Sequence, residues 1–245
     1  MNNDLIKAAI AEFIGTFILV FLGCAAVVVV TVNSGLGPAV PALAHGLGLV
    51  GIVFMYGHIS GAHVNPAVTL GLLVGNQIKL DRALFYWVAQ FLGAIAAALV
   101  LRLTLPEGSP LGETTGSLTS TNLWGAAILE AFLTFILVSA VYQAAAFNKA
   151  GNNAALAIGL TLGACIAGFG AITGASLNPA RTLGPAVVAG EFSYLLPYLV
   201  GIFAGGAVAG IVHSNFFYSA PEVPTPPHRA GEGTSGGRGK SSRRR

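Results

Sequence analysis

Two stretches of this chain, HISGAHVNPAVTLG at residues 58–71 and AITGASLNPARTLG at residues 171–184, are identical at nine of fourteen positions. A second pair precedes them, because EAFLTFILV at residues 130–138 echoes EFIGTFILV at residues 12–20. The same two motifs in the same order identify an internal duplication. The chain therefore contains two related halves, and each half carries one Asn-Pro-Ala sequence.

The composition indicates a membrane protein. Hydrophobic residues make up 54% of the chain and charged residues only 9%, against about 25% charged residues in typical soluble proteins. No charged residue occurs between Glu12 and Lys79. A spanning helix needs about 20 mostly apolar residues, and the sequence predicts six such spans, at roughly 8–31, 41–60, 83–105, 122–146, 153–172 and 195–217.

The duplication predicts an inverted repeat. Residues 1–218 are expected to form one channel-like domain whose halves, about 5–105 and 122–218, hold three spans each. Because three is odd, the second half must enter the membrane with the opposite orientation. The helix-compatible residues after each Asn, 66–76 and 179–190, extend only ~16 Å, about half of a ~30 Å hydrocarbon core. We expect these two segments to enter from opposite faces and meet near the midplane.

The Asn-Pro pairs mark the starts of these half-helices. Asn65 and Asn178 can cap a helix, and Pro66 and Pro179 suit its first turn. Two helix N-termini would then direct positive partial charge at one point, which favours a water-filled path there. Irregular backbone at this depth must be packed in protein or line such a path. We therefore expect the preceding segments to present carbonyl groups to the path, at Gly61, Ala62, His63, Gly174 and Ser176.

The basic residues predict the orientation and a distinct tail. Counting Lys and Arg in short loops places both termini in the cytoplasm, and we expect the cell (inner or plasma) membrane. Residues 219–245 hold six of the twelve Lys and Arg and read as a disordered basic tail, either solvated or in contact with anionic lipid. The rest of the chain holds six basic and seven acidic residues, so we expect no nucleic-acid partner.

The cysteine and histidine patterns offer no metal or redox site. Cys24 and Cys165 lie in separate apolar runs, which excludes a disulfide framework and a metal-binding Cys spacing. His58 and His63 have no neighbouring Cys or carboxylate, so we interpret them as loop-packing residues. No metal and no other cofactor is expected.

The sequence resembles the aquaporin or major intrinsic protein family. The resemblance rests on the doubled Asn-Pro-Ala motif (Asn65, Pro66, Ala67 and Asn178, Pro179, Ala180), on Glu12 and Glu130 in the first span of each half, and on Arg181 after the second motif. The resemblance covers residues 5 to about 218. It implies an all-α membrane protein with six transmembrane helices and two half-spanning helices. It also implies a homotetramer of passive water channels, rather than an enzyme. In that family the glutamates brace the half-helices, and the arginine belongs to a constriction that excludes protons and ions.

The same resemblance transfers three further constriction positions, His45, Ile166 and Ala175, by their spacing from the motifs. Strictly water-selective members usually have an aromatic residue at the position of His45 and a histidine at the position of Ile166. The set in this chain is instead similar to that of plant vacuolar-type members, which also pass ammonia or urea. We expect water first, then ammonia, urea or hydrogen peroxide. Glycerol facilitators typically place Asp after the arginine, where this chain has Thr182.

Several alternatives stay open at this point. Inverted repeats also occur in secondary transporters, in which Glu12 and Glu130 would couple transport to protons. The asparagines could serve only as helix caps, Arg181 could pair with Glu191, and His45 could simply bond a backbone carbonyl. An intramembrane enzyme lacks a nucleophile–base pair in this sequence. Glycines at four-residue spacing, Gly159/Gly163, Gly201/Gly205 and Gly206/Gly210, predict close helix crossings.

Overall fold

A computed structural model describes residues 3–217, and all regular structure in that part of the chain is helical. Six helices there are long and apolar enough to cross a membrane, three of them with a short helical extension. They are α1 (Asn3–Val32), α2 (Ala39–Ser60), α4 (Leu80–Thr104), α6 (Leu123–Val141), α7 (Ala154–Thr173) and α9 (Leu195–Val212). The predicted six-span fold is therefore confirmed. The predicted basic tail lies outside the described residues.

The remaining elements are short. Those beside the predicted motifs are α3 (Pro66–Val74) and α8 (Pro179–Ala189). The others are α5 (Ser117–Thr121), the 3₁₀ turns η1 (Ser34–Leu36) and η3 (Gly151–Asn153), and the π-helical turns η2 (Tyr142–Ala146) and η4 (His213–Phe217) that extend α6 and α9. The helix α5 was not predicted, because its five residues carry no apolar periodicity.

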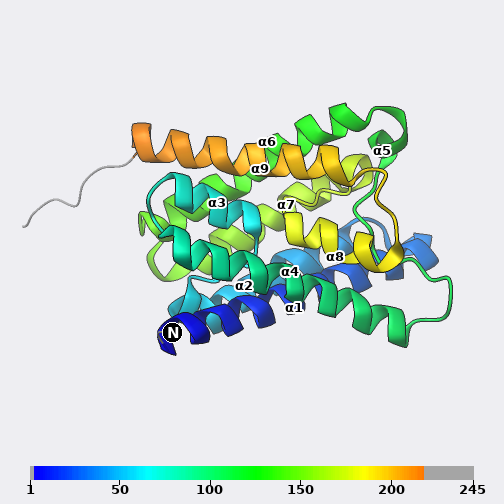
Figure 1. Ribbon diagram of the computed structural model, residues 1–245. Helices are drawn as coiled ribbons and strands as arrows, with labels where there is room; N and C mark the ends of the chain where they lie inside the picture. Colours follow the sequence, from blue (N-terminus) through cyan, green and yellow to red (C-terminus); the bar gives the residue numbers. More distant parts are fainter. Residues whose placement is uncertain (1–2, 218–245) are drawn as a thin grey trace, which may run out of the picture.

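Both ends of the described chain lie on the same side of the molecule (Figure 1). We call this side the terminal face and the opposite side, which carries α5, the distal face. The half-helix α3 lies in the half of the bundle toward the terminal face, and α8 lies in the half toward the distal face (Figure 1). The two half-helices therefore approach the centre from opposite faces, as the inverted repeat predicts.

The helix packing interlocks the two halves of the sequence. Helix α1 packs against α4, α6 against α9, and α2 against α7. The half-helix α3 packs on α9, and α8 packs on α4. Each half-helix is thus supported by the last long helix of the other half, so the position of one motif depends on the packing of both halves.

Glycines make the closest of these contacts possible. A Cβ atom at Gly205 would lie 2.1 Å from the carbonyl oxygen of Ala131 in α6. A Cβ atom at Gly206 would lie 2.5 Å from the carbonyl oxygen of Ala67 in α3. Since Cβ contacts this short essentially never occur, the two adjacent glycines let α9 touch the backbones of α6 and α3 on its two faces. The predicted close crossing is confirmed for α9.

The half-helices end slightly sooner than predicted. Helix α3 ends at Val74, two residues before the expected end, and Asn76 follows with a left-handed φ of +58°. Helix α8 ends at Ala189, where Gly190 adopts a φ of +77°. Left-handed residues commonly terminate helices, so local C-capping sets both ends.

Candidate functional site

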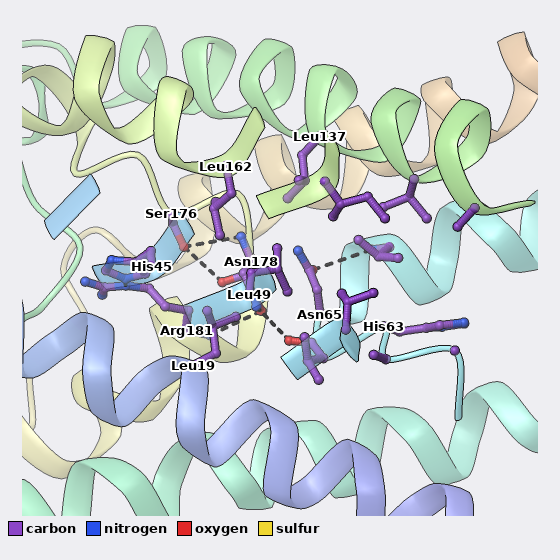
Figure 2. A pocket seen from close by; sticks show the side chains of 18 residues that line it. Leu19, His45, Leu49, His63, Asn65, Leu137, Leu162, Ser176, Asn178 and Arg181 are labelled. Carbon is purple, nitrogen blue, oxygen red and sulfur yellow. Dashed lines mark hydrogen bonds between the residues drawn. The ribbon is translucent and has the colours of Figure 1, made fainter. Parts of the chain in front are cut away.

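Asn65 and Asn178 lie close together at the centre of the molecule, at the facing N-termini of α3 and α8 (Figure 2). The Oδ1 atom of Asn65 accepts a hydrogen bond from the backbone N–H of Ala67 at 2.9 Å. The Oδ1 atom of Asn178 accepts one from the backbone N–H of Ala180 at 3.0 Å. Each asparagine therefore caps its own half-helix, as the sequence predicts.

The amide nitrogens of the two asparagines link the halves to each other. Asn65 Nδ2 donates to the carbonyl oxygen of Leu177 at 2.8 Å, and Asn178 Nδ2 donates to that of Val64 at 2.9 Å. The carbonyls of Val64 and Leu177 are thus occupied by the asparagines. Because an amide group has two N–H donors, one donor of each side chain is left for the cavity that both residues line.

The loops before the two asparagines hold an unusual backbone. Ala62 and Val64 have φ values of +47° and +42°, and Ala175 and Leu177 have values of +42° and +55°. Such conformations cost on the order of 1–3 kcal/mol per non-glycine residue and persist only where the surroundings impose them. The same strain at matching positions of the two repeats indicates that both loops are held by specific contacts.

Glu12 supplies these contacts for the first loop. Its side chain is completely buried. Oε1 accepts hydrogen bonds from Ser60 Oγ at 2.6 Å and from the backbone N–H of His63 at 2.9 Å. Oε2 accepts from the backbone N–H of Val64 at 2.6 Å and from Gln90 Nε2 at 2.8 Å. Four donors therefore converge on one carboxylate, which fixes the strained loop.

Glu130 holds the second loop in the same way with three donors. Its Oε1 atom accepts from Thr173 Oγ1 at 2.7 Å and from the backbone N–H of Ser176 at 3.0 Å. Its Oε2 atom accepts from the backbone N–H of Leu177 at 2.9 Å. The geometry of both glutamates is that of a brace. Their oxygens face loop donors, and neither residue lines the central cavity.

Two tyrosines complete the bracing, and neither belongs to a motif that we recognised in the sequence. Tyr86 donates to the carbonyl oxygen of Ser60 at 2.6 Å, and Tyr198 donates to that of Thr173 at 2.7 Å. The tyrosines follow their acceptors by 26 and 25 residues. Both pairs could have been found by aligning the two repeats beyond the motifs.

The centre of the molecule contains a narrow cavity of about 40 Å³. Its lining includes Asn65, Asn178 and the loop residues Gly61, Ala62, His63 and Ser176, together with several leucines and valines. A wider cavity of about 300 Å³, here called the vestibule, lies beside it and is lined by Ile166 and Gly174 among others. The lining sets of the two cavities share only His45 and Arg181, so these two residues stand where the cavities meet.

His45 and Arg181 are directly bonded. Nδ1 of His45 lies 2.8 Å from the carbonyl oxygen of Pro41, and Nε of Arg181 donates to Nε2 of His45 at 3.3 Å. A carbonyl can only accept and an arginine can only donate, so His45 is neutral with its proton on Nδ1. His45 therefore bonds a backbone carbonyl and also lines the cavity. Arg181 is 2% exposed, and its Nη1 atom also donates to Thr114 Oγ1 at 2.7 Å.

The other predicted site residues do not all line the same cavity. Ile166 lines the vestibule, while Ala175 is 2% exposed and is not among the residues that line either cavity. The His63 side chain lines the narrow cavity and packs edge-on against Tyr86 at 5.0 Å, so more than its carbonyl faces the path. Thr114 carried no sequence signal, because it lies in an irregular loop far from both motifs.

Glu191 does not neutralise Arg181, which instead bonds His45 and Thr114. It lies in the exposed turn after α8, where the hydroxyl and the backbone N–H of Ser193 donate to its carboxylate. These hydrogen bonds lower the pKa of Glu191 below its usual value. The buried guanidinium of Arg181 therefore stays available to the cavities.

Comparison with known proteins assigns the family. The family model described as Major intrinsic protein matches residues 1–213. The chain belongs to the major intrinsic protein family. Among curated members of this family, it is 43% identical to "Aquaporin TIP1-1" of Zea mays, over 87% of this chain and 88% of that protein. It is 41% identical to "Probable aquaporin TIP3-2" of Arabidopsis thaliana, over 94% of this chain and 90% of that protein.

A solved structure of the same family supports the fold. The aquaglyceroporin from Plasmodium falciparum superposes with a TM-score of 0.75 at 27% identity, covering 87% of this chain and 97% of that one. The sequence resemblance to the major intrinsic protein family is thus confirmed by the family model, by curated relatives and by structural similarity.

Proposed function

We propose that this integral membrane protein is a passive channel for water. The observation that carries the proposal is the pair of asparagines: each keeps its oxygen on a half-helix and turns one N–H donor to a narrow, largely apolar cavity. A water molecule whose oxygen accepts from these donors orients its hydrogens outward, which interrupts a proton relay. The relatives named as aquaporins support the same function.

The constriction explains ion exclusion. The N-termini of α3 and α8 place positive partial charge at the centre, and the buried Arg181 adds a full positive charge where the cavities meet. His45 contributes no charge, since both of its nitrogens have defined partners. Cations and protons therefore meet an electrostatic barrier at two depths, while neutral molecules find hydrogen-bonding partners.

We also propose that small neutral solutes pass, namely ammonia, urea and hydrogen peroxide. His45, Ile166, Ala175 and Arg181 would form the selectivity filter, and its similarity to vacuolar-type plant members agrees with the TIP-type names of the relatives. A glycerol facilitator is the second candidate, because a solved relative is an aquaglyceroporin. That relative is 27% identical, whereas the aquaporins above are 41–43% identical, so water and the smaller solutes are favoured.

A proton-coupled carrier is disfavoured by the two glutamates. Every oxygen of Glu12 and Glu130 accepts a hydrogen bond from a loop or a neighbouring helix. Neither residue lines a path along which a proton could reach it. Their bracing role, and not proton coupling, supports the channel.

The proposal includes a topology and an assembly. We propose that the terminal face is cytoplasmic and the distal face is outside, because Lys7, Lys79, Arg82 and Lys149 belong to helix ends and a connection on the terminal face. Four copies, each with its own pore, would associate in the bilayer. The TIP-type relatives lend the expected plasma membrane no support, so the likeness favours an internal membrane. Native mass spectrometry in lipid nanodiscs should give four copies of the chain.

Stopped-flow light scattering on proteoliposomes tests the solutes. Gradients of urea, ammonia, hydrogen peroxide and glycerol are compared with protein-free vesicles, with and without a pH difference. We expect urea and ammonia to enter faster than through lipid alone, glycerol to enter more slowly than urea, and no effect of the pH difference. Uptake that saturates and follows the proton gradient would instead establish a carrier.

A further inference from the structure

The segment 111–116, between α4 and α5, is fixed against the helices on both of its sides. Gly112 has a φ of +74°, and a Cβ atom there would lie 2.7 Å from the backbone of Cys24 in α1. A Cβ atom at Gly116 would lie 2.4 Å from the backbone of Ile172 in α7. This part of the loop is therefore clamped between two helices.

Glu113 lies between residues of this loop that point into the protein. Thr114 is fully buried and its hydroxyl accepts from Arg181, whereas Glu113 is partly buried and lines the vestibule. The backbone N–H of Leu111 donates to Glu113 Oε2 at 3.0 Å, and the backbone N–H of Thr115 donates to the Glu113 carbonyl. Within residues 3–217, Oε1 has no hydrogen-bond partner. The carboxylate is thus oriented by the loop and keeps one oxygen for the vestibule.

The vestibule therefore offers a fixed acceptor and a fixed donor. Glu113 and Arg181 both line it, yet they form no ion pair with each other. Arg181 uses one donor on His45 and one on Thr114, and a guanidinium has five. Ile166, Val27 and Val30 supply apolar surface beside them. A flat solute with N–H donors on one side and a carbonyl oxygen on the other matches this arrangement.

We infer that Glu113 is a specificity-determining residue that, with Arg181, holds urea and small primary amides in the vestibule before they enter the constriction. The amide N–H groups donate to Glu113 Oε1, and the amide oxygen accepts from Arg181. Hydrogen bonds to charged groups are stronger than neutral ones, so an amide is concentrated at the constriction. A water molecule makes equivalent hydrogen bonds in bulk solvent, so these two residues do not concentrate water in the vestibule. This inference rests on the proposed passage of small neutral solutes.

The test uses the full chain in proteoliposomes and measures urea and water permeability of the same vesicles. Glu113→Leu removes the acceptor, and Glu113→Gln keeps its shape without the charge. Glu107→Gln is the matched control, since Glu107 is an exposed carboxylate of the same connection and does not line the vestibule. We expect Glu113→Leu to lower the urea-to-water permeability ratio by about threefold or more, Glu113→Gln to lower it less, and Glu107→Gln to leave it unchanged.

Water permeability separates this role from a structural one. If the loop lost its position, Thr114 would release Arg181, and water and urea permeability would change together. That result, or an unchanged urea-to-water ratio in both Glu113 variants, would overturn the inference while leaving the channel intact. If the wild-type protein passes no urea above the lipid background, the inference fails together with the solute part of the proposed function.

Discussion

At the scale of single residues, Asn65 and Asn178 each perform two tasks with one amide group. The oxygen caps a half-helix, and the nitrogen both bonds the opposite loop and faces the cavity. No other side chain of similar size offers an acceptor and two donors in this geometry. The centre of the pore is therefore sensitive to a change of a single atom.

Asn178→Asp tests the two tasks of the asparagine side chain. The carboxylate keeps the helix cap but cannot donate to the Val64 carbonyl, and it brings negative charge to the centre. We expect lower water permeability and a cation leak above the vesicle background, measured by stopped-flow scattering and sodium flux. Asn152→Asp, at an exposed position of the 3₁₀ turn η3, should change neither. A variant that conducts water normally and stays tight to cations would contradict the role of Asn178.

Thr114→Val tests the support of Arg181. The substitution keeps the shape of the side chain and removes the acceptor of Arg181 Nη1. A buried donor left without a partner costs about 1–3 kcal/mol, and more when it is charged, so Arg181 should move away from Thr114. We expect a lower unfolding temperature and a changed glycerol-to-water permeability ratio. An unchanged ratio would show that Thr114 does not position the arginine.

At the scale of elements, each half-helix depends on a glutamate brace and on a helix of the other half. The two braces differ in the number of hydrogen bonds. Glu12 accepts four, including one from Gln90 in α4, whereas Glu130 accepts three. Helix α9 reaches α3 through Gly206. The positions of Asn65 and Asn178 are therefore set by contacts outside the motifs themselves.

Glu130→Gln and Glu12→Gln should loosen these braces. An amide replaces one acceptor oxygen with a donor, which leaves at least one buried donor unpaired at about 1–3 kcal/mol. We expect lower unfolding temperatures and lower water permeability, with the larger loss in Glu12→Gln, whose new NH₂ group faces more donors. Thermal unfolding in detergent and vesicle shrinkage measure both. If the wild-type protein instead showed uptake that follows a pH gradient, and the variants lost this dependence while keeping normal stability, the glutamates would act in proton coupling.

Gly206→Ala should displace α3. Overpacking of this kind costs about 1–3 kcal/mol, and the new methyl group would push on Ala67, two residues after Asn65. We expect reduced water permeability per folded protein. Gly168→Ala is the matched control, because nothing lies within 4 Å of a Cβ atom there. Equal permeability of the two variants would exclude this path from α9 to the pore.

At the scale of the whole molecule, the spans, the half-helices and the position of the asparagines were predictable, because hydropathy and an internal repeat encode them. The bracing role of the glutamates came from the family resemblance. Thr114, Glu113 and the bond between His45 and Arg181 were not predictable. They depend on an irregular loop whose course is set by the packing of Gly112 and Gly116 on distant helices. Contacts of this kind leave no periodic signal in a sequence.

In the proposed channel, water passes the paired asparagines without protons. The most direct measurement is osmotic water permeability of proteoliposomes as a function of temperature, together with proton flux in the same vesicles. We predict fast shrinkage with an activation energy well below that of bare lipid and no proton flux above the lipid background. Shrinkage no faster than bare lipid, or water flux accompanied by proton flux, would contradict this account.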